Sequence, residues 1–364
     1  MMDLRDFETH RIVQKGLGNV KNPFLLAIVE KNDFTLKGKL NPHGVSFCIS
    51  PIINAITRVG TLEEKNLLFQ AFLENTAYKE IASNKRGHKG ETVQLVDEAI
   101  RVTNNVRSRQ NKIRDSKIQD IIKQIESEKL YDNKLIAVRQ EVLSQNEKGL
   151  TGLIANQIMS QYKKPVLILS EVKHEDGKLY WDGSGRNAPN CGLDDLRGLL
   201  ASTEQVAMAQ GHASAFGISI PQDKFDDFIA TTNEALADYD FSTTYKVDAI
   251  YSSAELDPND IISIYQMNDL WTQGIEEPLI AVNNIKLSQE NIFINEKILK
   301  ITDQNTGISY IKFKPTSEEM MTFSTVKFGY TIELVGTCNF STYDNTPQIM
   351  IKDYNLAKNV IWDF

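Results

Sequence analysis

Two stretches in the first third of the chain carry apolar residues at the spacing of an amphipathic helix. In residues 61–75, Thr61 precedes Glu64 at capping-box spacing, which marks the start of a helix. The apolar residues that follow on one helical face are Leu67, Leu68, Ala71 and Phe72. Residues 91–130 hold the longest pattern, with apolar positions at Val93, Val96, Ile100, Val106, Ile113, Ile118, Ile121, Ile122 and Ile125. The pattern predicts a capped helix and a very long one, separated by the charged loop 83–90.

The middle of the chain alternates between apolar runs and amphipathic segments. Apolar runs that predict strands lie at 135–143, 165–172, 178–187 and 216–221. Segments with helical spacing lie between or after them, at 149–162, 193–202 and 224–239. Such alternation is typical of a compact α/β domain, which we place at residues 133–238.

The last part, residues 239–364, is rich in β-branched and aromatic residues and poor in helical patterns. Turn-rich breaks such as DQNTG and STYDNTP separate its strand-like segments, which favours a small antiparallel barrel. Residues 1–132 would then form a mostly helical connector. The fold class we predict is multidomain, α/β plus β.

Composition limits what this chain does. With 364 residues and 41% hydrophobic residues it buries a sizeable core, but its net charge of −8 opposes wholesale capture of nucleic acid. A local basic face lies in the middle of the long helix, at Arg101, Arg107, Arg109, Lys112, Arg114 and Lys117. This face is either a solvated helix surface or a basic wall beside a nucleic-acid groove, with Arg107 and Arg109 as contacts.

Cysteine usage and hydropathy indicate a compartment. The odd number of cysteines, 3, favours neither a disulfide framework nor a cysteine-based zinc site, so we expect a reducing cytoplasm. No apolar run approaches the ~20 residues that span a bilayer, and the charged start is unlike a signal peptide. We expect no membrane association.

Metal and hydrolase motifs are absent from the sequence. Its 5 histidines form no HxxH, HExxH or DHH pattern. The adjacent pairs Asp194-Asp195 and Asp226-Asp227 point about 100° apart on a helix, which favours surface charges over a shared metal cradle. There is neither a GxSxG nor a GxGxxG motif.

Two glycine-containing stretches remain as candidates for chemistry. In GSGR, residues 183–186, we expect a turn whose N–H groups face an anion while Arg186 binds it as a fork. In QGHASAFG, residues 210–217, His212 follows Gly211 in a second expected turn. Each could equally be an ordinary turn, with a solvated arginine in one and a satisfied histidine in the other.

The order of these stretches resembles a known family. The series GLTGLIANQIMSQYKKPVLIL, GSGR, QGHASAFGISI and FDDF is similar to the DHH-associated domain of the DHH phosphoesterases. Within that superfamily, ISPIINAITRVG, LWTQGIEEPLIAVNNI and VKFGYTIELVGTCNFSTYDNTPQIMIKDY resemble segments of the RecJ single-strand DNA exonucleases. The resemblance implies the end of a DHH domain and a helical connector over residues 1–132, a DHH-associated α/β domain over 133–238 and an OB-like barrel over 239–364.

The resemblance also implies roles for particular residues. Ser184, Gly185 and Arg186 would receive a terminal 5′-phosphate. His212, after Gly211, would be catalytic and approach the scissile phosphate. Asn54 and Arg58 would line the cleft between domains. The chain departs from the family pattern at Ile52, Thr57 and Gln210.

In this family a DHH domain upstream holds Mn or Mg, and the chain resembles the part that follows it. We therefore expect a fragment that binds single-stranded DNA, holds no metal by itself and needs a DHH domain for cleavage, in DNA repair or recombination. Two alternatives stay open. One is a non-catalytic interaction protein, such as a split-nuclease subunit bound to a DHH-domain partner chain or a binder of a host protein. The other is a phosphoesterase for small oligonucleotides.

Overall fold

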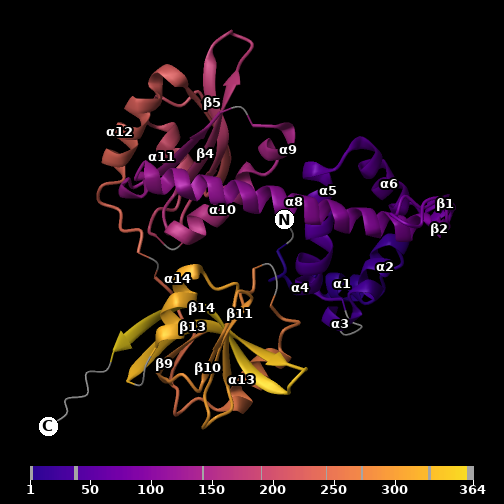
Figure 1. Ribbon diagram of the computed structural model, residues 1–364, viewed down its shortest axis with the longest axis vertical. Coiled ribbons are helices and arrows are strands. Elements are labelled where there is room, and N and C mark those ends of the chain that lie inside the picture. The colour runs from indigo at the N-terminus through magenta and orange to yellow at the C-terminus, as the bar shows by residue number, and fades with distance from the viewer. Residues whose placement is uncertain are drawn as a thin grey trace. The chain divides into compact units, whose positions relative to one another are not determined.

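The chain divides into two compact units. The computed structural model describes residues 3–36, 40–141, 143–189, 191–242, 244–271, 274–326 and 329–358 (Figure 1). What we call the main unit comprises Val20–Leu40 and Gly44–Thr244. The tail unit comprises Met1–Asn19, Asn41–His43 and Tyr245–Phe364. The predicted boundaries at 132 and 238 stay a prediction.

The main unit begins with helices packed along one long helix. The predicted long helix is confirmed as α8 (Leu95–Ser127), and α2, α5 and α6 all pack against it. The capping box is also confirmed, since Thr61 accepts from the Glu64 N–H while the Glu64 carboxylate accepts from the Thr61 N–H. The helical segments of the main unit before α8 are α2 (Pro23–Lys31), α3 (Asp33–Leu36), η1 (Val45–Ile49), α5 (Ser50–Val59), α6 (Leu62–Phe72) and α7 (Glu74–Ala77), and of α4 (Pro42–Gly44) only Gly44 belongs to this unit.

The charged loop 83–90 joins two strands that the sequence did not predict. These strands, β1 (Glu80–Ala82) and β2 (Thr92–Gln94), pair antiparallel and lead directly into α8. The loop is therefore the tip of a β-hairpin.

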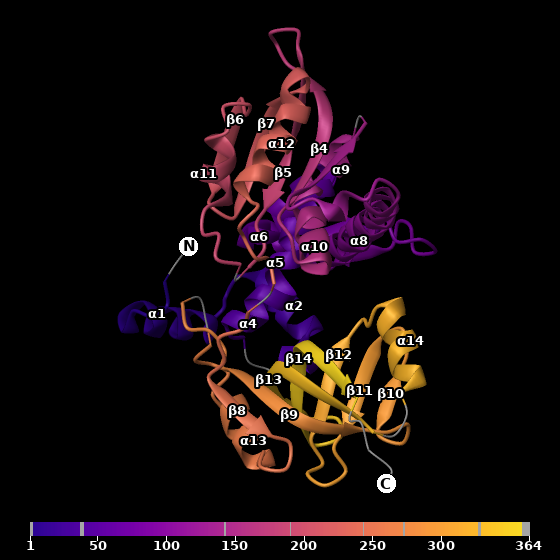
Figure 2. The ribbon, with the colours of Figure 1, turned by 90° about the vertical axis from the view of Figure 1, so that its left-hand side faces the viewer.

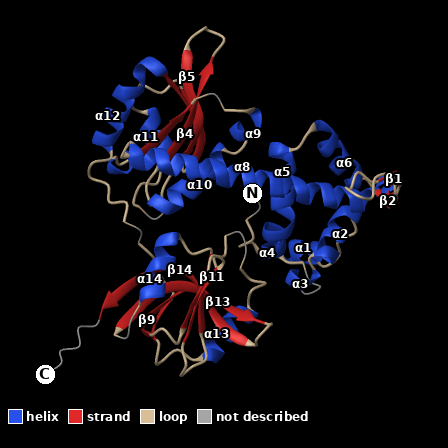
Figure 3. Ribbon diagram, in the orientation of Figure 1, coloured by secondary structure: helices blue, strands red, loops and turns tan. Residues whose placement is uncertain are grey.

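The predicted α/β part is confirmed as a five-stranded sheet with helices on both faces (Figures 2 and 3). Its strand order is β3-β4-β5-β7-β6, and only β3 and β4 run parallel. The strands are β3 (Ile136–Gln140), β4 (Val166–Lys173), β5 (Leu179–Arg186), β6 (Met208–His212) and β7 (Ala215–Pro221). The helical segments are η2 (Leu130–Asp132), α9 (Gln145–Lys148), α10 (Thr151–Tyr162), α11 (Leu196–Ala201), η3 (Gln222–Lys224) and α12 (Phe225–Ala235).

The two faces of this sheet differ. Helices α11 and α12 bury Leu196, Leu200 and Phe228 against Phe216 and Ile218 of β7. Helix α10 packs on the opposite face, against β4 and β5. The predicted strand at 135–143 ends earlier than expected, and its Val142 lies outside the described residues.

The first of the two predicted turns is a strand, and the second is a β-hairpin whose turn comes after His212. The stretch GSGR, residues 183–186, forms the end of β5 rather than a turn. Its glycines are needed for packing: a Cβ on Gly183 would lie 1.9 Å from the Ile168 carbonyl oxygen, and one on Gly185 would lie 2.4 Å from the Phe216 ring. In the other stretch, Gly211 and His212 end β6, and the turn falls at residues 213–214.

The tail unit is built on one seven-stranded sheet with order β10-β11-β12-β14-β13-β9-β8. The described strands form an open row rather than the closed antiparallel barrel we predicted, and β12–β14 and β8–β9 are parallel pairs. The strands are β8 (Ala249–Ser252), β9 (Leu279–Leu287), β10 (Ile292–Ile294), β11 (Ile298–Thr302), β12 (Ser309–Phe313), β13 (Tyr330–Ser341) and β14 (Thr346–Lys358). The helices are α1 (Phe7–Leu17), α13 (Pro258–Gln266) and α14 (Ser317–Thr325).

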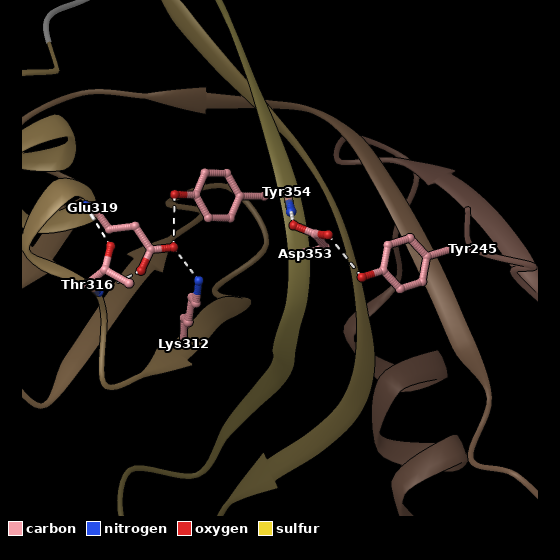
Figure 4. Close-up of polar contacts among 6 residues, drawn as sticks. All are labelled: Tyr245, Lys312, Thr316, Glu319, Asp353 and Tyr354. Atoms are coloured by element: carbon pink, nitrogen blue, oxygen red, sulfur yellow. Dashed lines mark hydrogen bonds and ion pairs between the residues drawn. The ribbon is translucent and has the colours of Figure 1, made fainter. Parts of the chain in front are cut away.

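Helix α14 is fixed to the tail sheet by a polar cluster (Figure 4). Its buried Glu319 completes a capping box with Thr316, forms an ion pair with Lys312 of β12 and accepts a 3.0 Å hydrogen bond from the Tyr354 hydroxyl of β14. The Tyr354 ring also packs edge-on against Phe323 of α14. Of the predicted segments in this unit, residues Thr272, Gln273, Lys327 and Phe328 lie outside the described residues.

Candidate functional site

A cavity of about 280 Å³ in the main unit is lined by three cationic side chains, Arg58, Lys148 and Arg186. It opens at the start of α10, where the end of β5 and residues of α5 and α9 converge. The lining residues are Arg58, Lys148, Gly149, Thr151, Gly152, Leu153, Asn156, Ser184 and Arg186. The structure thus brings Arg58 together with Ser184 and Arg186, whereas the sequence analysis had assigned Arg58 to a cleft between domains.

The start of α10 supplies a local positive field. No side chain caps the first turn of this 12-residue helix, because the residue at the N-cap is the buried Leu150. Uncapped N–H groups and the helix dipole place partial positive charge at the helix start. This end of α10 therefore favours an anion in the cavity.

Hydroxyl groups line the wall between helix and strand. The Thr151 and Ser184 Oγ atoms lie 2.9 Å apart, and Thr151 Oγ1 also lies 3.1 Å from the Lys148 carbonyl oxygen. The carbonyl can only accept, so when Thr151 donates to it, Ser184 donates to Thr151. If Thr151 turns its proton to Ser184 instead, the Ser184 hydroxyl is released to donate to a bound anion.

Gly152 makes room for the Arg186 side chain. A Cβ at Gly152 would lie 2.4 Å from Arg186 Nη2 and 3.7 Å from Ser184 Oγ. The sequence analysis predicted a helical segment at residues 149–162 but assigned Gly152, Lys148 and Asn156 no role. The only signal was the glycine itself in the first helical turn, where backbone often approaches another group closely.

The cations of the cavity repel one another. Burial of the half-buried guanidinium, and then the positive charge of Arg58, lower the pKa of Arg186. Arg186 Nη1 donates to the Gly185 carbonyl at 2.7 Å, but among the described residues no carboxylate pairs with Arg58, Lys148 or Arg186. An anion would relieve this repulsion, since desolvated charge-assisted hydrogen bonds are the strong ones.

The same face of the sheet extends from the cavity to His212. Residues directly opposite on neighbouring strands project from the same face, and strands lie about 4.8 Å apart. Two in-register rows cross β5, β7 and β6: Arg186–Ala215–His212 and Ser184–Gly217–Gln210. The Cα atoms of Arg186 and His212 are thus roughly 10 Å apart, with only small side chains between them.

Gly211 shapes the edge strand beside His212. Its φ is +132°, and a Cβ there would lie 2.9 Å from the Ala215 carbonyl oxygen, so a side chain would be strained. Arg197 donates to the Gly211 carbonyl at 3.0 Å. His212 is exposed on this edge and does not line the cavity.

The other predicted contacts lie outside the cavity. Asn54 is exposed on α5, one helical turn before Arg58. Arg109 of α8 is engaged in packing: its Nη2 lies 2.7 Å from Glu64 Oε2 and 2.9 Å from the Val59 carbonyl oxygen. Arg107 is partly exposed on the same helix and is not among the lining residues.

A further polar group lies on the same sheet face, and sequence reasoning missed it. The Asp182 carboxylate accepts from Ser219 at 2.6 Å and lies 2.8 Å from His174 Nε2. The carboxylate stands between the serine and the histidine, so the histidine cannot activate the serine as a nucleophile. This group supports the β4–β5–β7 sheet.

The described residues do not fit a catalytic metal. They include no cluster of three or more His, Cys, Asp or Glu side chains that could hold an ion. Among them there is also no helix long and apolar enough to cross a membrane.

Comparison with known proteins shows which proteins this chain is similar to. No family model matches the sequence. Over 98% of its length the chain is 30% identical to YorK of Bacillus subtilis, named as a prophage-derived single-strand DNA-specific exonuclease, and it matches the YorK of Bacillus phage SPbeta equally. Across 42% of the chain it is 26% identical to the single-stranded-DNA-specific exonuclease RecJ of Haemophilus influenzae. It spans 62% of the length of the two YorK proteins and 27% of that RecJ.

The fold agrees with these relatives. RecJ from Thermus thermophilus, in complex with Mn²⁺, superposes with a TM-score of 0.66 at 15% identity, covering 95% of this chain and 46% of the RecJ chain. Its Mg²⁺ complex gives 0.64 at 14% identity, covering 95% and 49%. The resemblance seen in the sequence is therefore confirmed: this chain is similar to part of the YorK proteins and has the fold of part of the RecJ chain.

Proposed function

We propose that the main unit holds the 5′-phosphate end of a single DNA strand. Arg186 and Arg58 bind the terminal phosphate from two sides, with Lys148 at the rim and the N–H groups of α10 below. The single observation that carries this proposal is the meeting of these cations, without a carboxylate partner among the described residues, at an uncapped helix start.

The strand then continues over the exposed part of the sheet. Ala215 and Gly217 leave room above β7, and His212 contacts a phosphate further along the strand. A separation of roughly 10 Å between the two positions suits successive groups of one backbone better than a single small anion.

In the intact protein we propose a single-strand DNA-specific exonuclease, as the relatives are named. The RecJ structures contain Mn²⁺ or Mg²⁺, and we expect cleavage to use such ions. Because the described residues lack a fitting set of ligands, the ions would be held by groups that the structure does not describe. This chain contributes the residues that bind the DNA strand.

The test compares short oligonucleotides that differ only at the 5′ end. The protein should prefer a 5′-phosphate over a 5′-hydroxyl by about 10- to 100-fold, the value of one or two charge-assisted hydrogen bonds. Arg186→Ala should abolish the preference, whereas Arg11→Ala, an exposed arginine of α1, should keep it. Equal binding of both 5′ ends by the unmodified protein would overturn the proposal.

A further inference from the structure

The tip of the β1–β2 hairpin is a concentrated positive surface outside the cavity. Residues 83–90, SNKRGHKG, carry Lys85, Arg86 and Lys89 and no carboxylate, although the whole chain has a net charge of −8. All three side chains are exposed. His88, the other basic residue of the tip, lies 2.9 Å from Glu91 at the base of the hairpin.

A buried carboxylate holds this tip in place. Glu98 of α8 is 3% exposed and accepts from the Asn84 N–H at 3.1 Å and from Ser83 Oγ at 3.4 Å. Arg101 pairs with the same carboxylate and, against the opposing effect of burial, lowers the pKa of Glu98. The tip is thus anchored to a long helix, which reduces the conformational entropy that binding would cost.

Nearby acids do not neutralise the tip. Glu98 is occupied by Arg101, and the exposed Asp97 forms an ion pair with Lys31 at 3.4 Å. Among the described residues, no carboxylate forms an ion pair with Lys85, Arg86 or Lys89. The three cations therefore present their charge to an external anion.

The tip and the cavity lie at different positions along α8. Lys117 pairs with Glu147 of α9 at 3.7 Å, beside the cavity residue Lys148. Leu95, which follows the hairpin, precedes Lys117 by 22 residues, or about 33 Å of helix. An anion that reaches both places must be a long polyanion.

We propose that the hairpin tip is a second DNA-binding site, which contacts the sugar–phosphate backbone of a strand whose end lies in the cavity. The inference rests on the proposed function, because it assumes the single DNA strand whose 5′-phosphate end that proposal assigns to the cavity. The tip offers three cationic side chains and no Phe, Tyr or Trp ring, so it binds phosphates irrespective of base sequence.

The experiment measures binding of 5′-phosphorylated single strands of about 5 and about 25 nucleotides by fluorescence anisotropy. Lys85→Ala/Arg86→Ala/Lys89→Ala should weaken binding of the long strand and leave the short one unchanged. Losing three phosphate contacts should lower the slope of log affinity against log salt concentration by about 2. Between about 50 and 200 mM salt the unmodified protein should therefore lose about 15-fold more affinity than the variant.

A matched control removes equal charge elsewhere. Lys21→Ala/Lys123→Ala/Lys224→Ala changes three exposed lysines of the main unit and should leave the salt slope close to that of the unmodified protein. An unchanged slope for the tip variant, or equal losses on short and long strands, would overturn the inference. Equal binding of 5′-phosphorylated and 5′-hydroxyl strands by the unmodified protein would instead count against the proposed function, even if the tip variant weakens binding of the long strand alone.

Discussion

The cavity around Arg186 and the cluster around Glu319 are both partly buried and charged, yet they differ in what satisfies the charge. Glu319 has a cation, a hydroxyl and a backbone N–H as partners, all within the tail unit. Arg186 has a backbone carbonyl and a second cation. A satisfied group stabilises the fold, whereas an unsatisfied one is available for a ligand. The distinction separates structural from binding residues more sharply than residue type does.

The largest effect should come from removing a satisfied group. Glu319→Ala removes the capping box, the Lys312 pair and the Tyr354 bond together, and leaves a lysine without its partner. We expect a loss of about 3 kcal/mol in the free energy of unfolding of the tail unit, measured by urea denaturation. Binding of short 5′-phosphorylated DNA to the folded protein should not change.

Glu319→Gln is the matched control for this variant. Its amide oxygen can still accept from the Thr316 N–H, so the loss should be smaller than that of alanine. An unfolding midpoint of Glu319→Ala equal to that of the unmodified protein would mean that the cluster does not hold α14.

Gly152→Ala should show the opposite of Glu319→Ala: stability is kept, and affinity for DNA is lowered. The new Cβ would lie 2.4 Å from Arg186 Nη2, and this flexible side chain can move away, so the fold is retained. Alanine favours the helix by up to about 1 kcal/mol, so stability should be unchanged or higher. Affinity for a short 5′-phosphorylated strand should fall about tenfold, as expected when one charge-assisted bond is misplaced.

A glycine in a helix of the tail unit offers a control for this change. Gly16→Ala in α1 has no atom within 4 Å of the added Cβ, so it should keep full affinity. A Gly152→Ala protein that binds 5′-phosphate as tightly as the unmodified one would show that Arg186 does not need its observed position.

Sequence reasoning succeeded where the cause is local. The capping box of Thr61 and Glu64 spans three residues, and the apolar spacing of α8 reports its own buried face, so both were predictable. The GSGR stretch was assigned to a turn because glycines suggest turns. The structure assigns its glycines to packing against Ile168 and Phe216, which come from other strands.

The candidate site was only partly predictable for the same reason. The family resemblance singled out Arg58, Ser184 and Arg186, but Gly152 matters through its distance to an arginine 34 positions later, which no local pattern reveals. Arg109 was grouped with Arg107 as a nucleic-acid contact from helix charge alone. Its partner Glu64 lies 45 residues away.

A change of Arg109 should give the smallest effect. It tests whether an arginine that already has a carboxylate partner stabilises the fold rather than binding DNA. Arg109→Ala leaves Glu64 and the Val59 carbonyl without this donor, so the main unit should lose about 1 kcal/mol of stability while its affinity for DNA stays the same. A similar alanine variant of Arg107, which forms no ion pair among the residues that the structure describes, serves as the control. Weaker DNA binding by Arg109→Ala with unchanged stability would restore the role predicted from the sequence.

The pH dependence of stability sharpens this last test. The hydrogen bond from Arg109 lowers the pKa of Glu64, against the opposing effect of burial, from an ordinary value of 4.5. Because the folded state has the lower pKa, the pair contributes fully above about pH 4.5, and the contribution is lost as the pH falls through the folded value. The stability difference between the unmodified protein and Arg109→Ala should therefore shrink in acid, as measured by urea denaturation at a series of pH values. A difference that stays constant down to low pH would mean that Arg109 acts through its bond to the Val59 carbonyl and its packing rather than through the carboxylate.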